Sequence, residues 1–169
     1  CCGASAYHLG AHGEGLEAMR RNIDAWWPEV EAGAEAILIN ASGCGAMIKE
    51  YGELLAGDPD YAQKARRVTE LARDPVEILQ NEDLSPLGRP GQGRKLAFHA
   101  PCSLQHGQQL KNVVEPILSG LGFELTPVPD GHLCCGSAGT YSITQPEISK
   151  KLRDSKVAAL EAGKPHLIA

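Results

Sequence analysis

The stretch "HLCCGSAGTYS" (132–142) contains two adjacent cysteines followed by a glycine. The chain opens on the same tripeptide, in "CCGASAYHLG" (1–10). Two copies of one motif therefore contain four of the six cysteines of the chain: Cys1 and Cys2 with Gly3, and Cys134 and Cys135 with Gly136.

The residues that follow each Cys-Cys-Gly also match. Each copy continues into a helix, then the tripeptide "EAG" (31–33 and 161–163), then an apolar strand. In the first copy this strand leads to "SGCG" with Cys44, and the same register predicts a further cysteine about five residues beyond Ala169. We therefore expect an internal repeat of two similar halves, the first lacking its upstream part and the second its last cysteine.

Periodicity and turn residues predict an α/β fold with parallel strands, because short apolar runs alternate with amphipathic segments. Prolines and glycines mark 84–93 as a linker loop between a first half at 1–83 and a second half at 94–169. The expected helices are 12–30, bent or ended near Pro28, 46–57, 60–73, 75–80, 108–122 and 146–163; the expected strands are 34–40, 94–99, 123–128 and one beginning at 165. We expect tight turns at 42–45 and 101–107, packing of Trp26 and Trp27 in their helix, and a solvent-exposed helix face at Lys49, Glu50 and Tyr51.

The composition is that of an ordinary soluble globular protein of one domain or two small halves. Of 169 residues, 43% are hydrophobic and 22% charged, and the net charge of −5 argues against a nucleic-acid or anionic-membrane surface. No apolar run approaches the roughly 18 residues that a membrane span needs. The cysteines are expected to be cytosolic thiols, and a first residue other than Met predicts that the natural chain begins earlier.

The cysteine-bearing segments all follow predicted strands, so they should gather at the carboxyl edge of a parallel sheet. Thiolates brought together there repel one another unless they are protonated, oxidised or bound to a soft cation. Nearby glycine amides and a following helix N-terminus suit an anionic iron–sulfur cluster. We expect two separate ligand groups: Cys102, Cys134 and Cys135 with Gly136, and Cys1, Cys2 and Cys44 with Gly3.

Other interpretations stay open from the residues alone. A structural zinc site is one, although spaced Cys-x-x-Cys knuckles are absent, and a redox-active dithiol at Cys134 and Cys135 is another. His99, His106 and His132 flank the cysteines and are weaker ligand candidates. We assign no catalytic residue, because no acid–base or nucleophile signature is visible.

The motifs "PCSLQH" (101–106), "CCGSAG" (134–139) and "SGCG" (42–45) resemble the cysteine-rich CCG domain. That domain is found in heterodisulfide reductases and in the iron–sulfur subunits of 2-hydroxy-acid oxidases. Longer stretches, such as "NIDAWWPEVEAGAEAILINASGCGAMIKEYGELL", are similar to the iron–sulfur subunits of glycolate oxidases, and the resemblance covers nearly the whole chain.

The resemblance implies an electron-transfer subunit of a glycolate oxidase or dehydrogenase complex, with this chain alone not catalytic. It implies an iron–sulfur cofactor, with 4Fe-4S as the expected type. The implied partners are flavin-binding subunits, and quinone is a candidate electron acceptor. The resemblance further implies a cytoplasmic location, which can be peripheral on the inner face of the membrane, and a ferredoxin-like region upstream of this chain. Heterodisulfide reductase motifs end in Cys-x-x-Cys, whereas Cys44 stands alone, so a five-cysteine cluster is not expected. A catalytic thiol or cluster site acting on a disulfide is the alternative.

Overall fold

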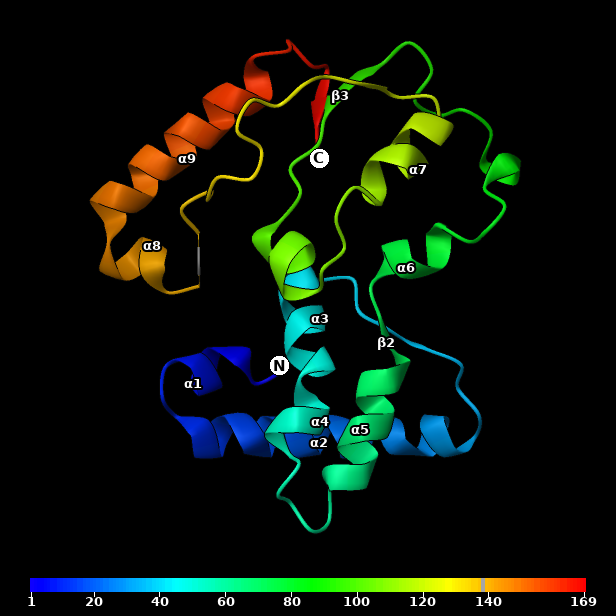
Figure 1. The fold of residues 1–169 in the computed structure, drawn as a ribbon, viewed down its shortest axis with the longest axis vertical. Coiled ribbons are helices and arrows are strands. Elements are labelled where there is room, and N and C mark those ends of the chain that lie inside the picture. The colour runs from blue at the N-terminus through cyan, green and yellow to red at the C-terminus, as the bar shows by residue number, and fades with distance from the viewer. Residues whose placement is uncertain (138) are drawn as a thin grey trace. The chain divides into compact units, whose positions relative to one another are not determined.

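The computed structural model describes residues 1–137 and 139–169, which form two compact units (Figure 1). The first unit comprises Cys1–Ile78 and Gly107–Gln109, and the second comprises Leu79–His106 and Leu110–Ala169. The chain thus leaves the first unit, returns to it for three residues, and leaves again. The division falls just before the segment 84–93, which lies within the second unit.

The first unit is mainly helical around a two-stranded parallel sheet. Its elements are α1 (Ala4–His8), α2 (His12–Glu31), β1 (Ile37–Leu38), α3 (Ser42–Lys49), α4 (Tyr51–Leu54), α5 (Ala62–Leu71), β2 (Ala72–Arg73) and α6 (Pro75–Leu79), the last ending at the division. Strands β1 and β2 pair in parallel, with Ile37 opposite Ala72. The intervening helices make the crossover that parallel strands require.

The second unit contains a three-stranded parallel sheet. Its elements are the 3₁₀ helix η1 (Ser85–Leu87), β3 (Lys95–Ala97), the π-helical turn η2 (Ser103–Gly107), α7 (Val114–Gly120), β4 (Glu124–Leu125), α8 (Tyr141–Thr144), α9 (Pro146–Glu161) and β5 (Leu167–Ile168). The strand order is β4-β3-β5, with parallel pairing throughout. The prediction of helices alternating with parallel strands is therefore confirmed.

The core of the first unit forms where α2 meets the helices after β1. Met19 and Ile23, one turn apart on α2, are completely buried, as are Tyr51 and Val68 from α4 and α5. Trp26 and Trp27 pack against this core, as their helical spacing predicted. In Figure 1, α4 and α5 lie side by side next to α2. This helical layer supports the start of the chain, where Cys1 and Cys2 lie.

Several predicted boundaries are wrong. The expected turn at 42–45 is the first turn of α3, since the helix begins at Ser42. The helix predicted over 12–30 is confirmed as α2, which ends at Glu31, three residues past Pro28. The helix expected over 60–73 ends at Leu71, and the next two residues form β2. The helix expected over 108–122 begins only at Val114.

The late start of α7 has a clear cause in the backbone. Gln109 and Asn112 have positive φ angles of 59° and 56°, which a right-handed helix cannot include, so α7 starts after them. The predicted turn at 101–107 is the π-helical turn η2, which directly follows Cys102. The helices of the described chain include none that is both long and apolar enough to cross a bilayer.

Candidate metal centre

Cys2 and Cys44 are brought together in the first unit. Cys44 lies in the first turn of α3, just after the carboxyl end of β1, and Cys2 directly precedes Gly3, the N-cap of α1. Cys2 lies close enough to Cys44 to act on the pKa of its thiol. Burial raises the pKa of Cys44, and the hydrogen bond and charge of Cys2 raise it further. The protonated thiol of Cys44 is therefore favoured over its thiolate.

A polar network anchors the backbone of the first two cysteines. The Tyr51 hydroxyl donates to the carbonyl of Cys2 at 2.7 Å, and the Asn22 amide donates to the carbonyl of Cys1 at 2.9 Å. The same amide donates to the Tyr51 oxygen, also at 2.9 Å. Tyr51 was expected on a solvent-exposed face and is instead completely buried, because it lies beneath the cysteine motif. Burial above all raises the pKa of Tyr51 to about 12.

Gly3 lets the motif approach α2 more closely than any other residue could. Its φ of +89° lies in the left-handed region, and a Cβ added there would lie 2.7 Å from the carbonyl oxygen of Gly15. The glycine of the Cys-Cys-Gly motif is therefore required by the backbone geometry.

The second motif is built in a similar way against α9. Gly136 has a φ of +83°, and a Cβ there would lie 2.4 Å from the carbonyl oxygen of Ser149. The buried Ser149 hydroxyl donates to the Gly136 carbonyl at 2.7 Å. The Gly136 amide donates to the sulfur of Cys134 at 3.3 Å, the kind of bond expected for a ligand sulfur. Ala138, inside the motif "CCGSAG", lies outside the described residues.

The three cysteines of the second unit differ in their surroundings. Cys134 and Cys102 are exposed, and Cys135 is half-buried. Cys102 lies at the start of η2, after the carboxyl end of β3. Of the flanking histidines, His99 is half-buried; burial first and then the charge of Lys156 lower the pKa of His99, which favours a neutral imidazole.

The types of donor in these two motifs suit an iron–sulfur cluster, but the cysteines of each group do not all lie close together. Thiolate donors, glycine cradles and an amide bonded to sulfur all suit such a group. Within residues 1–137 and 139–169, however, no three His, Cys, Asp or Glu side chains lie close enough together to hold a metal ion. The two predicted ligand groups, Cys1, Cys2 and Cys44 and Cys102, Cys134 and Cys135, thus remain predictions, with Cys2 and Cys44 the pair that the structure joins.

Sequence reasoning missed Lys156, which lies behind the second motif. Only 5% of this residue is exposed, and its Nζ donates to the Gly131 carbonyl at 2.9 Å. It lines a cavity of about 190 Å³ together with Cys134. The spacing of residues along α9 could have indicated that Lys156 is buried, because Ser149, Lys156 and Leu160 lie on the same buried stripe of this helix.

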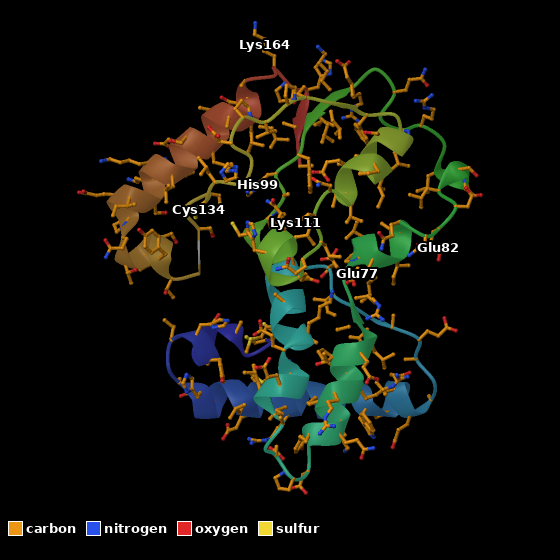
Figure 2. The ribbon with its side chains drawn as sticks, viewed as in Figure 1. Glu77, Glu82, His99, Lys111, Cys134 and Lys164 are labelled. Atoms are coloured by element: carbon orange, nitrogen blue, oxygen red, sulfur yellow. The ribbon has the colours of Figure 1, made fainter. Side chains whose placement is uncertain are left out.

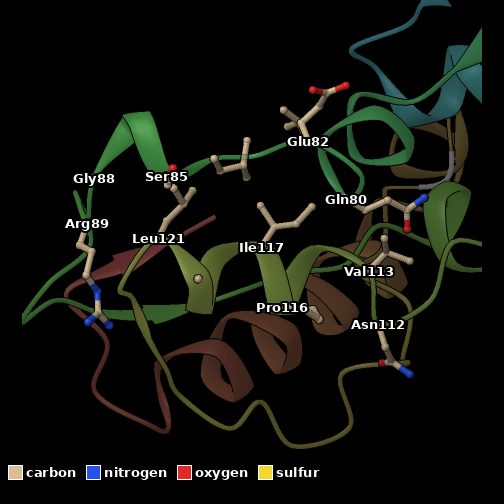
Figure 3. Close-up of a pocket in the computed structure, with 13 residues that line it drawn as sticks. Gln80, Glu82, Ser85, Gly88, Arg89, Asn112, Val113, Pro116, Ile117 and Leu121 are labelled. Atoms are coloured by element: carbon tan, nitrogen blue, oxygen red, sulfur yellow. The ribbon is translucent and has the colours of Figure 1, made fainter.

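A larger cavity of the second unit, about 670 Å³, contains no cysteine in its wall. It lies between the 79–89 segment and α7; Ile117 from α7 and Leu121, directly after it, project toward the cavity (Figure 3). The lining is mostly apolar. This cavity is therefore separate from the residues that carry the metal chemistry.

Comparison with known proteins agrees with the cysteine motifs. The chain is 60% identical over 99% of its length to the glycolate oxidase iron-sulfur subunit of Escherichia coli, of which it spans 41%. It is 32% identical to lactate utilization protein A of Geobacillus kaustophilus over 95% of the chain and 66% of that protein, and 34% identical to the probable glycolate oxidase iron-sulfur subunit of Bacillus subtilis, of which it spans 38%.

The chain thus spans about two fifths of the length of the glycolate oxidase subunits that it matches. No solved structure matches it significantly. The model of the cysteine-rich domain CCG matches residues 1–49 and 96–169, which together include all six cysteines. This protein belongs to the CCG cysteine-rich domain family.

Proposed function

We propose that this chain is the cysteine-rich part of an iron–sulfur subunit that carries electrons away from an enzyme oxidising a small 2-hydroxy acid, glycolate in the first instance. The Cys2–Cys44 pair carries the proposal, because two soft donors from distant segments meet at the end of a strand. The identity of 60% to a protein named as such a subunit gives the substrate class.

The cofactor proposed is a 4Fe-4S cluster, which would supply one-electron transfer. Cys1, Cys2 and Cys44 are the candidate ligands in the first unit, and Cys102, Cys134 and Cys135 in the second. Gly3 and Gly136 bring the backbone close to each site. The described residues offer thiols and amide donors that suit electron transfer, so we propose this role for the chain without a catalytic step of its own.

The proposal extends to partners and place. Flavin-binding subunits would donate the electrons, and quinone would accept them. The complex would lie in the cytoplasm, peripherally on the inner face of the membrane. These statements follow from the resemblance to the iron–sulfur subunits of glycolate oxidases.

We also propose that the two units are copies of one ancestral repeat. Support comes from the helix beneath each motif: Gly15 of α2 contacts Gly3, and Ser149 of α9 contacts Gly136. Two turns further along each helix, Asn22 and Lys156 bind backbone carbonyls of the cysteine-bearing segments. Superposition of the two helix-and-motif assemblies tests this proposal, and helices that cross their motifs in opposite directions would contradict it.

A second candidate function is a catalytic thiol acting on a disulfide. The exposure of Cys102 and Cys134 favours it, since a thiol must be accessible to attack a disulfide sulfur. A redox titration of the full-length protein with and without a disulfide substrate separates the two functions. Reduction of the disulfide by the isolated full-length protein would favour the catalytic thiol.

The experiment for the main proposal uses the full-length subunit, purified without oxygen and assembled with its partners. Cys44→Ser should lower iron and acid-labile sulfide content and abolish glycolate-dependent quinone reduction, while the flavin content stays unchanged, because a hydroxyl is a harder and less acidic ligand than a thiol. Ala41→Ser is the matched control, since it adds the same hydroxyl at an exposed position one turn away. Full iron content and activity in Cys44→Ser would contradict the proposal, and bound zinc in place of iron would indicate a structural site.

A further inference from the structure

The burial of Lys156, a positively charged residue, is not explained by the cysteine motif alone. Lysine is almost never fully buried without an anionic partner, yet only 5% of this residue is exposed to solvent. Its Nζ atom lies 2.9 Å from the Gly131 carbonyl oxygen and 3.5 Å from that of Asp130. The ion pairs found among the described residues include none to Lys156.

The two carbonyl groups orient the ammonium group but do not neutralise it. A buried charge is costly unless it is paired, so an unpaired lysine points to an anion that belongs nearby. After burial, the positive charge of Lys156 is the second cause of the lowered pKa of His99. A compensating anion would therefore stabilise this part of the unit.

The position of Cys134 identifies the chemistry of that anion. Cys134 and Lys156 line the same cavity of about 190 Å³, whose other walls include Leu133, Leu152 and Ala159. Figure 2 shows Cys134 on the loop beside α9. The wall also contains Ser155 and the exposed Asp130, whose carboxylate forms no ion pair with Lys156 among those found in the described residues. A mainly apolar wall with a thiol beside the ammonium group suits a soft, sulfur-rich anion better than a hydrated oxyanion.

We propose that Lys156 supplies the fixed positive charge that stabilises the anionic metal–sulfur group bound through Cys134 and thereby sets its reduction potential. This inference rests on the proposed function. Lys156 is a positioning residue and not a ligand, because an ammonium group has no lone pair to offer a metal. Its bonds to the carbonyls ahead of the motif also hold the cysteine loop against α9.

The direction of the effect follows from charge. When the group takes one electron from a flavin-binding partner, its negative charge increases by one, and no bond to Lys156 forms or breaks. A fixed cation stabilises the reduced state more than the oxidised state, since Coulomb attraction grows with the anion's charge. Removal of the cation should therefore make the midpoint potential more negative.

The test uses the full-length subunit and follows the cluster signal that disappears in Cys134→Ser. Lys156→Met removes the charge, Lys156→Gln removes it but keeps an N–H donor for the Gly131 carbonyl, and Lys156→Arg keeps it. Lys150→Met is the control, because it makes the same chemical change at an exposed position of α9. Iron content, thermal unfolding and the midpoint potential from an electron paramagnetic resonance titration are measured for each.

We expect the two neutral variants to shift the oxidised-to-reduced ratio at fixed potential by about tenfold or more, which is about 59 mV for one electron. Lys156→Arg and Lys150→Met should remain near the wild type. If Lys156→Met fails to fold, Lys156→Gln decides the question. An unchanged potential in a folded, iron-loaded neutral variant overturns the inference and leaves the proposed function intact, whereas a wild-type protein without a cluster removes both.

Discussion

Gly3 and Gly10 have the same φ angle of +89° and opposite surroundings. A Cβ added to Gly3 would collide with the Gly15 carbonyl, whereas nothing lies within 4 Å of a Cβ at Gly10. Alanine substitutions at the two positions therefore share the free-energy cost of a left-handed backbone, and only the one at Gly3 adds a steric clash. The difference between them measures how far the Cys-Cys-Gly motif depends on its close approach to α2.

Gly3→Ala should destabilise the protein by about 3 kcal/mol or more, and Gly10→Ala by about 1 kcal/mol. Both substitutions place a Cβ at positive φ, which costs roughly 1–2 kcal/mol, but only the first adds overpacking of roughly 1–3 kcal/mol. Urea unfolding of the two variants gives the difference. Equal losses would mean that the contact with Gly15 relaxes without cost.

Tyr51→Phe should lower the free energy of unfolding by about 1–3 kcal/mol, because the buried Cys2 carbonyl and Asn22 amide lose their partner. Tyr61→Phe is the control and should cost less, since its hydroxyl donates to Asp24 in a bond open to solvent. Chemical unfolding near pH 7 measures both.

The pH dependence of Tyr51 gives a separate prediction. The folded-state pKa of about 12 lies above the ordinary value of 10, so folding favours the protonated phenol. The corresponding stability is fully present below pH 10 and is lost as the pH rises through 12. Wild-type protein should therefore lose stability between pH 10 and 12, and Tyr51→Phe should show a shallower decline over the same range. Parallel curves would show that other groups control this transition.

At the scale of elements, the sequence patterns predicted the helices that have a regular apolar periodicity. They missed the short strand that exists only because a distant segment pairs with it. The apolar spacing of α2 and the proline at the start of α9 gave those helices nearly complete. Strand β2 has only two residues and exists because β1 pairs with it, so no local pattern marks it. Within the candidate site, the motif cysteines and glycines were found from their repetition.

The supports of the site were missed for a similar reason. Tyr51 and Lys156 are polar residues on helices, and average preference places such residues in solvent. For Lys156, the spacing with Ser149 and Leu160 marked the buried stripe of α9, whereas the burial of Tyr51 depends on the cysteine-bearing segment that packs over it. Tertiary contacts thus override side-chain preference at the positions that hold the motifs.

The Ser149 side chain of α9 should stabilise the conformation of the second Cys-Cys-Gly motif. Ser149→Ala removes the buried hydrogen bond to the Gly136 carbonyl and should cost about 1 kcal/mol, with faster hydrogen exchange of the Gly136 amide. Ser155→Ala on the same helix is exposed and should have almost no effect. If both variants behave alike, the motif loop holds its shape without α9.

At the scale of the whole molecule, each unit contains its own three cysteines, so their metal sites should be independent. Cys2→Ser with Cys44→Ser should remove one set of redox signals, and Cys134→Ser with Cys135→Ser another, because the two predicted ligand groups have no cysteine in common. Iron per full-length protein should fall by similar amounts in the two double variants and by their sum in the quadruple variant. Loss of all CCG-domain iron from either double variant would instead indicate a single shared site.

The return of Gly107–Gln109 to the first unit has a consequence for synthesis on the ribosome. Gln108 donates to the Ser42 carbonyl at 3.0 Å and fills the space beside Gly45, at the turn that carries Cys44. A nascent chain that has emerged only as far as Ile78 lacks this support. Translation must therefore proceed well into the second unit before the first can complete its fold. We therefore expect Cys1, Cys2 and Cys44 to reach their final environment only after Gly107–Gln109 have left the ribosome, which favours cluster insertion after that point.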